Sequence, residues 1–157
     1  MIDKSSHSIL EKYYGYKLFR EGQENIINSI LQGKDTLAIM PTGGGKSICY
    51  QIPALMLEGL TIVISPLISL MKDQVDTLKD MGIEAEYLNS TLSTSEENII
   101  INKIERKEVK ILYIAPERLD SLDFFSIIGK CRISQVAVKA VTIGLSLKIS
   151  IKCDILL

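Results

Sequence analysis

Met40-Pro41-Thr42-Gly43-Gly44-Gly45-Lys46-Ser47 is the stretch of this 157-residue chain that decides its fold. A short apolar run, residues 35–40, leads into it and is expected to form a buried strand, and residues 47–57 are expected to follow it as a helix. A strand that turns through glycines into a helix leaves several backbone N–H groups without partners, and such groups bind phosphate. The stretch therefore predicts a P-loop that holds the phosphates of a nucleoside triphosphate.

Each residue of this loop has an expected role in binding the nucleotide. The glycines at 43–45 let the backbone wrap closely around a phosphate because no Cβ interferes, and Thr42 is expected to bind the nucleotide as part of the same loop. Lys46 is expected to reach the β- and γ-phosphates as the catalytic residue, and the Ser47 hydroxyl to ligate Mg²⁺. Met40 occupies the first glycine position of the strict motif, so the alternative is a glycine-rich connection that merely precedes a lysine.

Outward from the loop, strand-like and helix-like segments alternate. This order predicts an α/β fold, a parallel sheet with helices on both faces, whose ligands lie at the carboxyl ends of the strands. The loops after Met40, Ile64, Leu88 and Ile114 would then share one edge of the sheet. The further strands are expected at 60–64, 84–88, 110–114 and 133–138, and the further helices at 67–81, from Ser93 or Thr94 to about 107, and at 121–128.

Composition narrows the class of protein. The chain is 46% hydrophobic and 24% charged, with a net charge of -1, which is ordinary for one globular domain and gives no basic signature of nucleic-acid binding. Its start lacks the pattern of a signal peptide, and its apolar runs are shorter than the roughly 18 residues of a membrane helix. A cytoplasmic protein without a membrane partner is the expectation. The three cysteines have neither zinc-site nor redox-motif spacing.

Several further segments converge on one family. In this order and spacing they resemble the first helicase domain of RecQ-family, superfamily 2 DNA helicases, over about residues 9–138. That resemblance implies a RecA-like P-loop domain, here truncated, that uses ATP and Mg²⁺ and acts on DNA in repair and recombination. The segments are Gly15-Tyr16, Phe19-Arg20-Glu21-Gly22-Gln23, Pro41 to Ala54, Ser65 to Gln74, Leu88-Asn89-Ser90-Thr91 and Tyr113-Ile114-Ala115-Pro116-Glu117-Arg118.

The resemblance implies roles for individual side chains, each with a plain alternative. Tyr16 would stack on adenine, and Arg20 and Gln23 would contact it, with Gln23 reading its edge; otherwise Tyr16 is a half-buried aromatic and Gln23 a surface helix residue. The loops near single-stranded DNA would contain Ser65, Pro66, Asn89, Ser90, Glu117 and Arg118. Otherwise Ser65 only caps a helix, and Arg118 is a solvated charge or a partner for Glu117.

The chain departs from the family after Val138. The family continues with an acidic D-E-A-H box, whose Asp helps to hold Mg²⁺ and whose Glu activates water, whereas this chain reads Lys139-Ala140-Val141-Thr142. We therefore expect an incomplete ATP-binding domain over 1–138 and a non-family tail over 139–157. Apolar residues alternate through 143–155, a strand pattern. We hypothesise that the tail is read in a shifted frame; the alternative is a genuine short protein whose tail forms an extra strand or swaps with a partner.

The expected function follows from these parts. The chain would be the ATP-binding fragment of a 3′-to-5′ DNA helicase, binding nucleotide and single-stranded DNA without unwinding on its own. The alternative is a non-catalytic module that sequesters DNA or a helicase partner. A small-molecule kinase is disfavoured because neither a substrate lid nor its acidic residues are visible. The sequence leaves the oligomeric state open.

Overall fold

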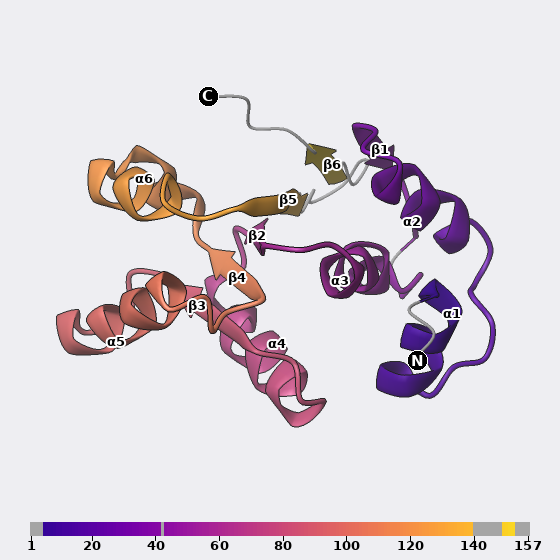
Figure 1. The fold of residues 1–157 in the computed structure, drawn as a ribbon, viewed down its shortest axis with the longest axis horizontal. Helices are drawn as coiled ribbons and strands as arrows, with labels where there is room; N and C mark the ends of the chain where they lie inside the picture. The colour runs from indigo at the N-terminus through magenta and orange to yellow at the C-terminus, as the bar shows by residue number, and fades with distance from the viewer. Residues whose placement is uncertain (1–4, 42, 140–148, 153–157) are drawn as a thin grey trace.

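The computed structural model describes residues 5–41, 43–139 and 149–152 of the chain. Helices and strands alternate along almost the whole of this part, as expected (Figure 1). In chain order the elements are α1 (Ser6–Ile9), the π-helical turn Leu10–Tyr14, α2 (Gln23–Leu31), β1 (Thr36–Ala38), α3 (Lys46–Met56), β2 (Leu60–Ile64), α4 (Ile68–Asp80), β3 (Ala85–Leu88), α5 (Thr94–Glu105), β4 (Ile111–Ile114), the 3₁₀ turn Pro116–Asp120, α6 (Leu122–Ile128), β5 (Ile133–Lys139) and β6 (Ile149–Lys152).

The strands form one sheet in the order β1-β6-β5-β2-β4-β3. The neighbours β5, β2, β4 and β3 are parallel, with Ile64 opposite both Ile114 and Val138 and with Leu88 opposite Ile114. Because parallel strands point the same way, the loops that follow β2, β3 and β4 leave from one edge. The predicted RecA-like α/β fold, a parallel sheet with helices, is confirmed.

Helices cover both faces of this sheet. On one face α2, α3 and α4 pack around Tyr50, Val63, Met71 and Tyr113, which are all buried. On the other face α5 and α6 pack against β2, β3 and β4, and in Figure 1 these two helices lie to the left of the strands while α3 lies to the right. Strands buried on both faces read as continuous apolar runs, which is why Leu60–Ile64 and Ile111–Ile114 lack alternation.

Strand β6 connects the P-loop strand to the rest of the sheet. It pairs antiparallel with both β1 and β5, with Ile151 opposite Thr36 on one side and Ala137 on the other. Two antiparallel steps give β1 the direction of β5, so the loop after β1 leaves from the same edge as the loops after β2, β3 and β4. The strand pattern expected in the tail is thus seen over Ile149–Lys152.

Two local predictions have different outcomes. Ser93 caps α5 as expected, in a capping box in which Glu96 bonds back to the Ser93 amide. The buried strand expected over 35–40 is wrong in extent and burial: β1 covers only Thr36–Ala38, and the side chains of Leu37 and Ile39 are 57% and 66% exposed. The reason is its place at the margin of the sheet, where β6 is its paired neighbour. Within the described ranges no helix is long and apolar enough to cross a bilayer.

Candidate nucleotide-binding site

The P-loop has the predicted course from strand through glycine turn to helix. Helix α3 begins at Lys46, and Gly45 before it has a φ of 74° and provides no side-chain cap, so the first N–H groups of the helix are left for a ligand. Gly43 also has a positive φ, 79°, a conformation that favours glycine. The residues expected to bind phosphate, Gly43, Gly44, Gly45, Lys46 and Ser47, are thus consecutive around one helix start; Thr42 lies outside the described residues.

Gln23 lies beneath this loop rather than on the surface. Its side chain is 1% exposed, and its Nε2 donates to the carbonyl oxygens of Gly45 at 3.1 Å and Gly44 at 3.4 Å. Its Oε1 accepts from the Arg20 amide at 2.8 Å, and the Arg20 guanidinium donates to the Gly43 carbonyl oxygen. The structure therefore brings the predicted adenine residues Arg20 and Gln23 to the P-loop. The surface-helix alternative for Gln23 is wrong.

Tyr16 follows Gly15, which ends the N-terminal helical segment with a φ of 72°. Its side chain is 53% exposed. A ring exposed to this degree can stack on a planar ligand, and the exposure also fits the alternative of an ordinary half-buried aromatic. Its stacking on adenine stays a prediction.

Ser47 borders a cavity of about 320 Å³ between α3 and α4. The hydroxyl of Tyr14 donates to Gln51 Oε1 at 2.9 Å in its wall. Gln74 and Asp73 enter from α4, and Asp73 is exposed. Ser47 and Gln51 are the polar side chains that α3 contributes to the lining of this cavity.

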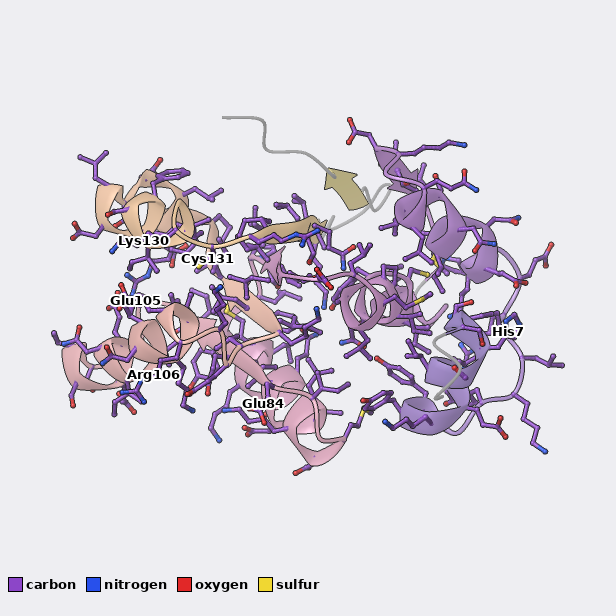
Figure 2. All side chains as sticks on the ribbon, in the orientation of Figure 1. His7, Glu84, Glu105, Arg106, Lys130 and Cys131 are labelled. Carbon is purple, nitrogen blue, oxygen red and sulfur yellow. The ribbon has the colours of Figure 1, made fainter. Side chains whose placement is uncertain are left out.

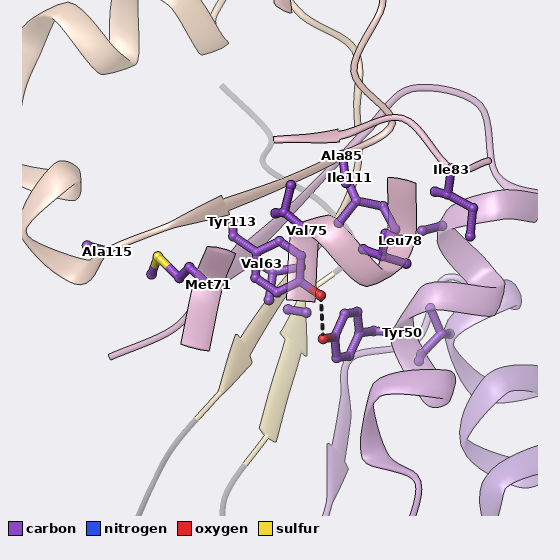
Figure 3. Packing of buried hydrophobic residues seen from close by; sticks show 13 residues of the cluster. Tyr50, Val63, Met71, Val75, Leu78, Ile83, Ala85, Ile111, Tyr113 and Ala115 are labelled. Carbon is purple, nitrogen blue, oxygen red and sulfur yellow. Dashed lines mark hydrogen bonds between the residues drawn. The ribbon is translucent and has the colours of Figure 1, made fainter. Parts of the chain in front are cut away.

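Behind this cavity lies a buried tyrosine pair that the sequence analysis did not single out. The hydroxyls of Tyr50 and Tyr113 are 2.9 Å apart (Figure 3). Gln51 Nε2 also donates to the Tyr113 hydroxyl at 3.2 Å. Burial raises the pKa of Tyr14, of Tyr50 and of Tyr113 above the usual value, so all three rings are neutral. Tyr50 and Gln51 follow the P-loop by one helical turn, and this spacing was the signal available in the sequence.

Lys139 ends β5 beside the same tyrosines. Its Nζ donates to Gln74 Oε1 at 2.9 Å and lies 5.3 Å and 5.5 Å from the ring centres of Tyr50 and Tyr113. Desolvation by burial lowers the pKa of Lys139 to about 8. Aromatic faces attract a cation, so at neutral pH the ammonium is held by the two rings and one amide oxygen. The sequence pointed to this position only as a departure from the family.

Of the residues expected to face DNA, some have buried side chains and others have side chains exposed to solvent. Ser65 and Asn89 are 3% and 2% exposed. Ser65 Oγ accepts from the Leu67 amide at 3.4 Å, and Leu67, not Ser65, is the cap of α4. Asn89 Oδ1 accepts from the Thr91 amide and hydroxyl at 2.9 Å and 2.7 Å. These two side chains shape their loops from within, whereas Pro66, Ser90 and Glu117 are exposed.

Arg118 joins two of these loops. Its guanidinium bonds both carboxylate oxygens of Glu97, at 2.6 Å and 3.0 Å, and the carbonyl oxygen of Asn89 at 3.3 Å. The alternative that Arg118 pairs with Glu117 is therefore wrong, because its acidic partner comes from α5. The parallel register brings the loops after β2, β3 and β4 together, but it turns Arg118 inward.

The residues around Ser47 do not fit a Mg²⁺ site. Mg²⁺ prefers oxygen ligands with carboxylates among them or in its outer shell. Among the described residues no group of three His, Cys, Asp or Glu side chains could hold a metal ion. At the end of β5 stands an ammonium group, which has donors and no acceptor. Mg²⁺ ligation by Ser47 stays a prediction.

Comparison with known proteins agrees with the motifs. Residues 20–141 match the family model of the DEAD/DEAH box helicases, so the chain belongs to that family. It is 51% identical over 137 residues to the ATP-dependent DNA helicase RecQ of Pasteurella multocida, and the match covers 87% of this chain and 22% of that protein. It is 52% identical over 134 residues to the ATP-dependent DNA helicase RecQ of Bacillus subtilis, and that match covers 85% of this chain and 23% of the relative. The ATP-dependent DNA helicase Q-like 5 of Arabidopsis thaliana is 42% identical over 124 residues, covering 79% and 14%.

These relatives confirm the resemblance to RecQ-family helicases. The chain spans less than a quarter of the length of each of the three. What the longer proteins do as a whole is therefore a proposal for this chain.

Proposed function

We propose that this chain is the nucleotide-binding part of a RecQ-like, ATP-dependent 3′-to-5′ DNA helicase and that it binds the phosphates of ATP at Gly43 to Ser47. The observation that carries the proposal is the pair of hydrogen bonds from Gln23 to Gly44 and Gly45. These bonds join Gln23 to the glycine loop, which supports one nucleotide reaching both the predicted adenine residues and the predicted phosphate residues.

In this proposal the groups have separate tasks. The free N–H groups at the start of α3 and the Lys46 ammonium hold the β- and γ-phosphates. Tyr16 stacks on the base, while Arg20 and Gln23 fix the loop beside it. We also propose that residues 1–138 form an incomplete ATP-binding domain, that residues 139–157 form a non-family tail, and that this chain does not unwind DNA alone.

Calorimetric titration with ATP tests the nucleotide site. Wild type should bind, and Lys46→Ala should weaken binding at least about tenfold, the equivalent of 1.4 kcal/mol, because a charge-assisted contact to phosphate is lost. Lys34→Ala, in an exposed lysine just before β1, is the matched control and should bind as wild type does. Equal binding by wild type and Lys46→Ala would refute the site.

DNA contact is the second part of the proposal. The exposed residues Pro66, Ser90 and Glu117 lie on the loops that follow β2, β3 and β4, and these loops share one edge of the sheet. Fluorescence anisotropy with a labelled single strand tests it, with and without ATP. Anisotropy that stays unchanged up to high protein concentration in both conditions would rule out DNA contact by these loops.

A further inference from the structure

The carboxyl end of β5 carries a cation beside the predicted phosphate site. Lys139 Nζ is held by Gln74 Oε1 and by the faces of Tyr50 and Tyr113. These partners come from α4, α3 and β4, the elements packed around this end of the strand. All three partners are uncharged, so the ammonium charge is not neutralised by the groups that hold it.

Two contacts connect this cation to the P-loop helix. Tyr50, whose ring centre lies 5.3 Å from Lys139 Nζ, is one helical turn after Ser47 on α3. Gln74, the hydrogen-bond acceptor of Lys139, lines the same cavity as Ser47. The field of Lys139 therefore extends toward the start of α3 across the region that Gln74 and Tyr50 occupy.

The surroundings favour an anion over a divalent cation. Lys46 and the N-terminal end of α3 are positive already, and Lys139 adds to that charge from its position against Gln74, which lines the cavity. Asp73 is the acidic residue among those lining the cavity, and it is exposed on α4. A Mg²⁺ ion here would meet repulsion from Lys139 and find one solvated carboxylate.

We propose that this site takes the nucleotide as a metal-free polyphosphate anion, with Lys139 supplying part of the positive charge that Mg²⁺ would otherwise bring. The inference rests on the proposed nucleotide site and concerns the form of the ligand. It makes Lys139 a charge-providing residue of the binding site. The consequence is an affinity for ATP that does not depend on magnesium.

The experiment is calorimetric titration of the full chain with ATP at neutral pH, once with excess MgCl₂ and once with excess EDTA. The expected result is a dissociation constant that agrees within about twofold between the two conditions, less than the tenfold that 1.4 kcal/mol represents. Binding that is tenfold or more tighter with MgCl₂ overturns the inference and leaves the nucleotide site intact. Lack of binding in both conditions overturns the nucleotide site as well.

Substitutions that change the charge at position 139 test whether Lys139 is the residue that makes ATP binding independent of magnesium. Lys139→Met should weaken binding in EDTA several-fold, and Lys139→Asp should bind tightly only when MgCl₂ is present, since it restores a carboxylate. Lys130→Met removes the same charge from an exposed lysine at the amino end of β5 and should bind as wild type does (Figure 2). Circular dichroism confirms that each variant is folded.

The rival explanation is that Asp73 holds a Mg²⁺ ion at this site, and the variant Asp73→Asn tests it. If Asp73 holds Mg²⁺, wild type binds more tightly with MgCl₂ and Asp73→Asn loses that gain, which overturns the inference. If Lys139 acts as proposed, Asp73→Asn binds ATP equally in MgCl₂ and in EDTA.

Discussion

Gln23 and Gly45 are joined by a hydrogen bond of 3.1 Å from the Gln23 side-chain amide to the Gly45 carbonyl oxygen, although they belong to different elements. Because the amide is buried, the bond has no competition from water. The segment that carries the predicted adenine residues is thus joined directly to the loop that carries the predicted phosphate residues.

Gln23→Ala should therefore reduce both stability and nucleotide affinity. It leaves the carbonyl groups of Gly44 and Gly45 without this donor, which costs about 1–3 kcal/mol of unfolding free energy. Urea denaturation measures the first effect and calorimetry with ATP the second. Gln32→Ala, at the exposed end of the same helix, is the control and should change stability by less than about 0.5 kcal/mol. Equal stability of the two variants would show that the bond contributes nothing.

Gly45→Ala should be more damaging than an alanine in a similar backbone conformation elsewhere. Gly45 and Gly82 have φ of 74° and 78°, so both substitutions introduce backbone strain of about 1–2 kcal/mol. At Gly45 the new Cβ would also lie 2.4 Å from Gln23 Nε2, whereas at Gly82 the space is open. Denaturation of both variants isolates the steric part, which should disappear in a Gln23→Ala background. A persistent difference in that background would contradict the contact.

The stability of the fold should rise with pH above about 8 because of Lys139. Its pKa is lowered from 10.5 to about 8, so between these values the unfolded chain binds a proton that the folded chain has released. Unfolding free energy then increases with pH over that window, by at most about 3 kcal/mol. Denaturation at several pH values from about 7 to 8.5 measures the slope, because at higher pH the unfolded cysteines and tyrosines ionise and the raised pKa values of Cys49 and Tyr50 in the fold oppose the effect. Lys139→Met should flatten it and Lys130→Met should not; a slope that survives in Lys139→Met would assign it to another group.

The pair Arg118–Glu97 should contribute more than an exposed pair. Both side chains are mostly buried, 20% and 27% exposed, and the contact is bidentate. A double-mutant cycle with Arg118→Met and Glu97→Gln should give a coupling of about 1–2 kcal/mol. The same cycle on Arg132 and Glu58, which are 74% and 82% exposed, should give less than about 0.5 kcal/mol. Similar couplings for the two pairs would mean that burial adds nothing here.

A proline at position 151 should release the P-loop strand. Ile151 pairs with Thr36 and with Ala137, and proline has no N–H to donate to either neighbour. In Ile151→Pro the amides of β1 should exchange with solvent much faster than in wild type. The amides of β3 and β4 should keep their protection, since their pairing does not involve β6. Unchanged exchange in β1 would show that β6 does not hold it.

Prediction from sequence succeeded where neighbours along the chain decide the outcome. A cap of α5 at Ser93 or Thr94, a helix start at Ser47, one residue after the observed one, and the parallel strands were foreseen because hydrophobic runs, glycines and caps act within a few positions. It failed for β1, whose apolar residues Leu37 and Ile39 are exposed at the margin of the sheet. An apolar run of that length indicates a strand, but its burial depends on which strands lie beside it.

The sequence by itself determined a strand, a glycine turn and a helix built to hold phosphate, since the glycines at 43–45 allow the positive φ that the turn needs and Lys46 and Ser47 begin the helix. Only the tertiary structure decided that Arg118 pairs with Glu97, 21 positions away, and that Lys139 meets Gln74, 65 positions away. The physical reason is that strand order and register bring the carboxyl ends of the strands to one edge. Which side chains meet there follows from the whole sheet and not from any segment of it.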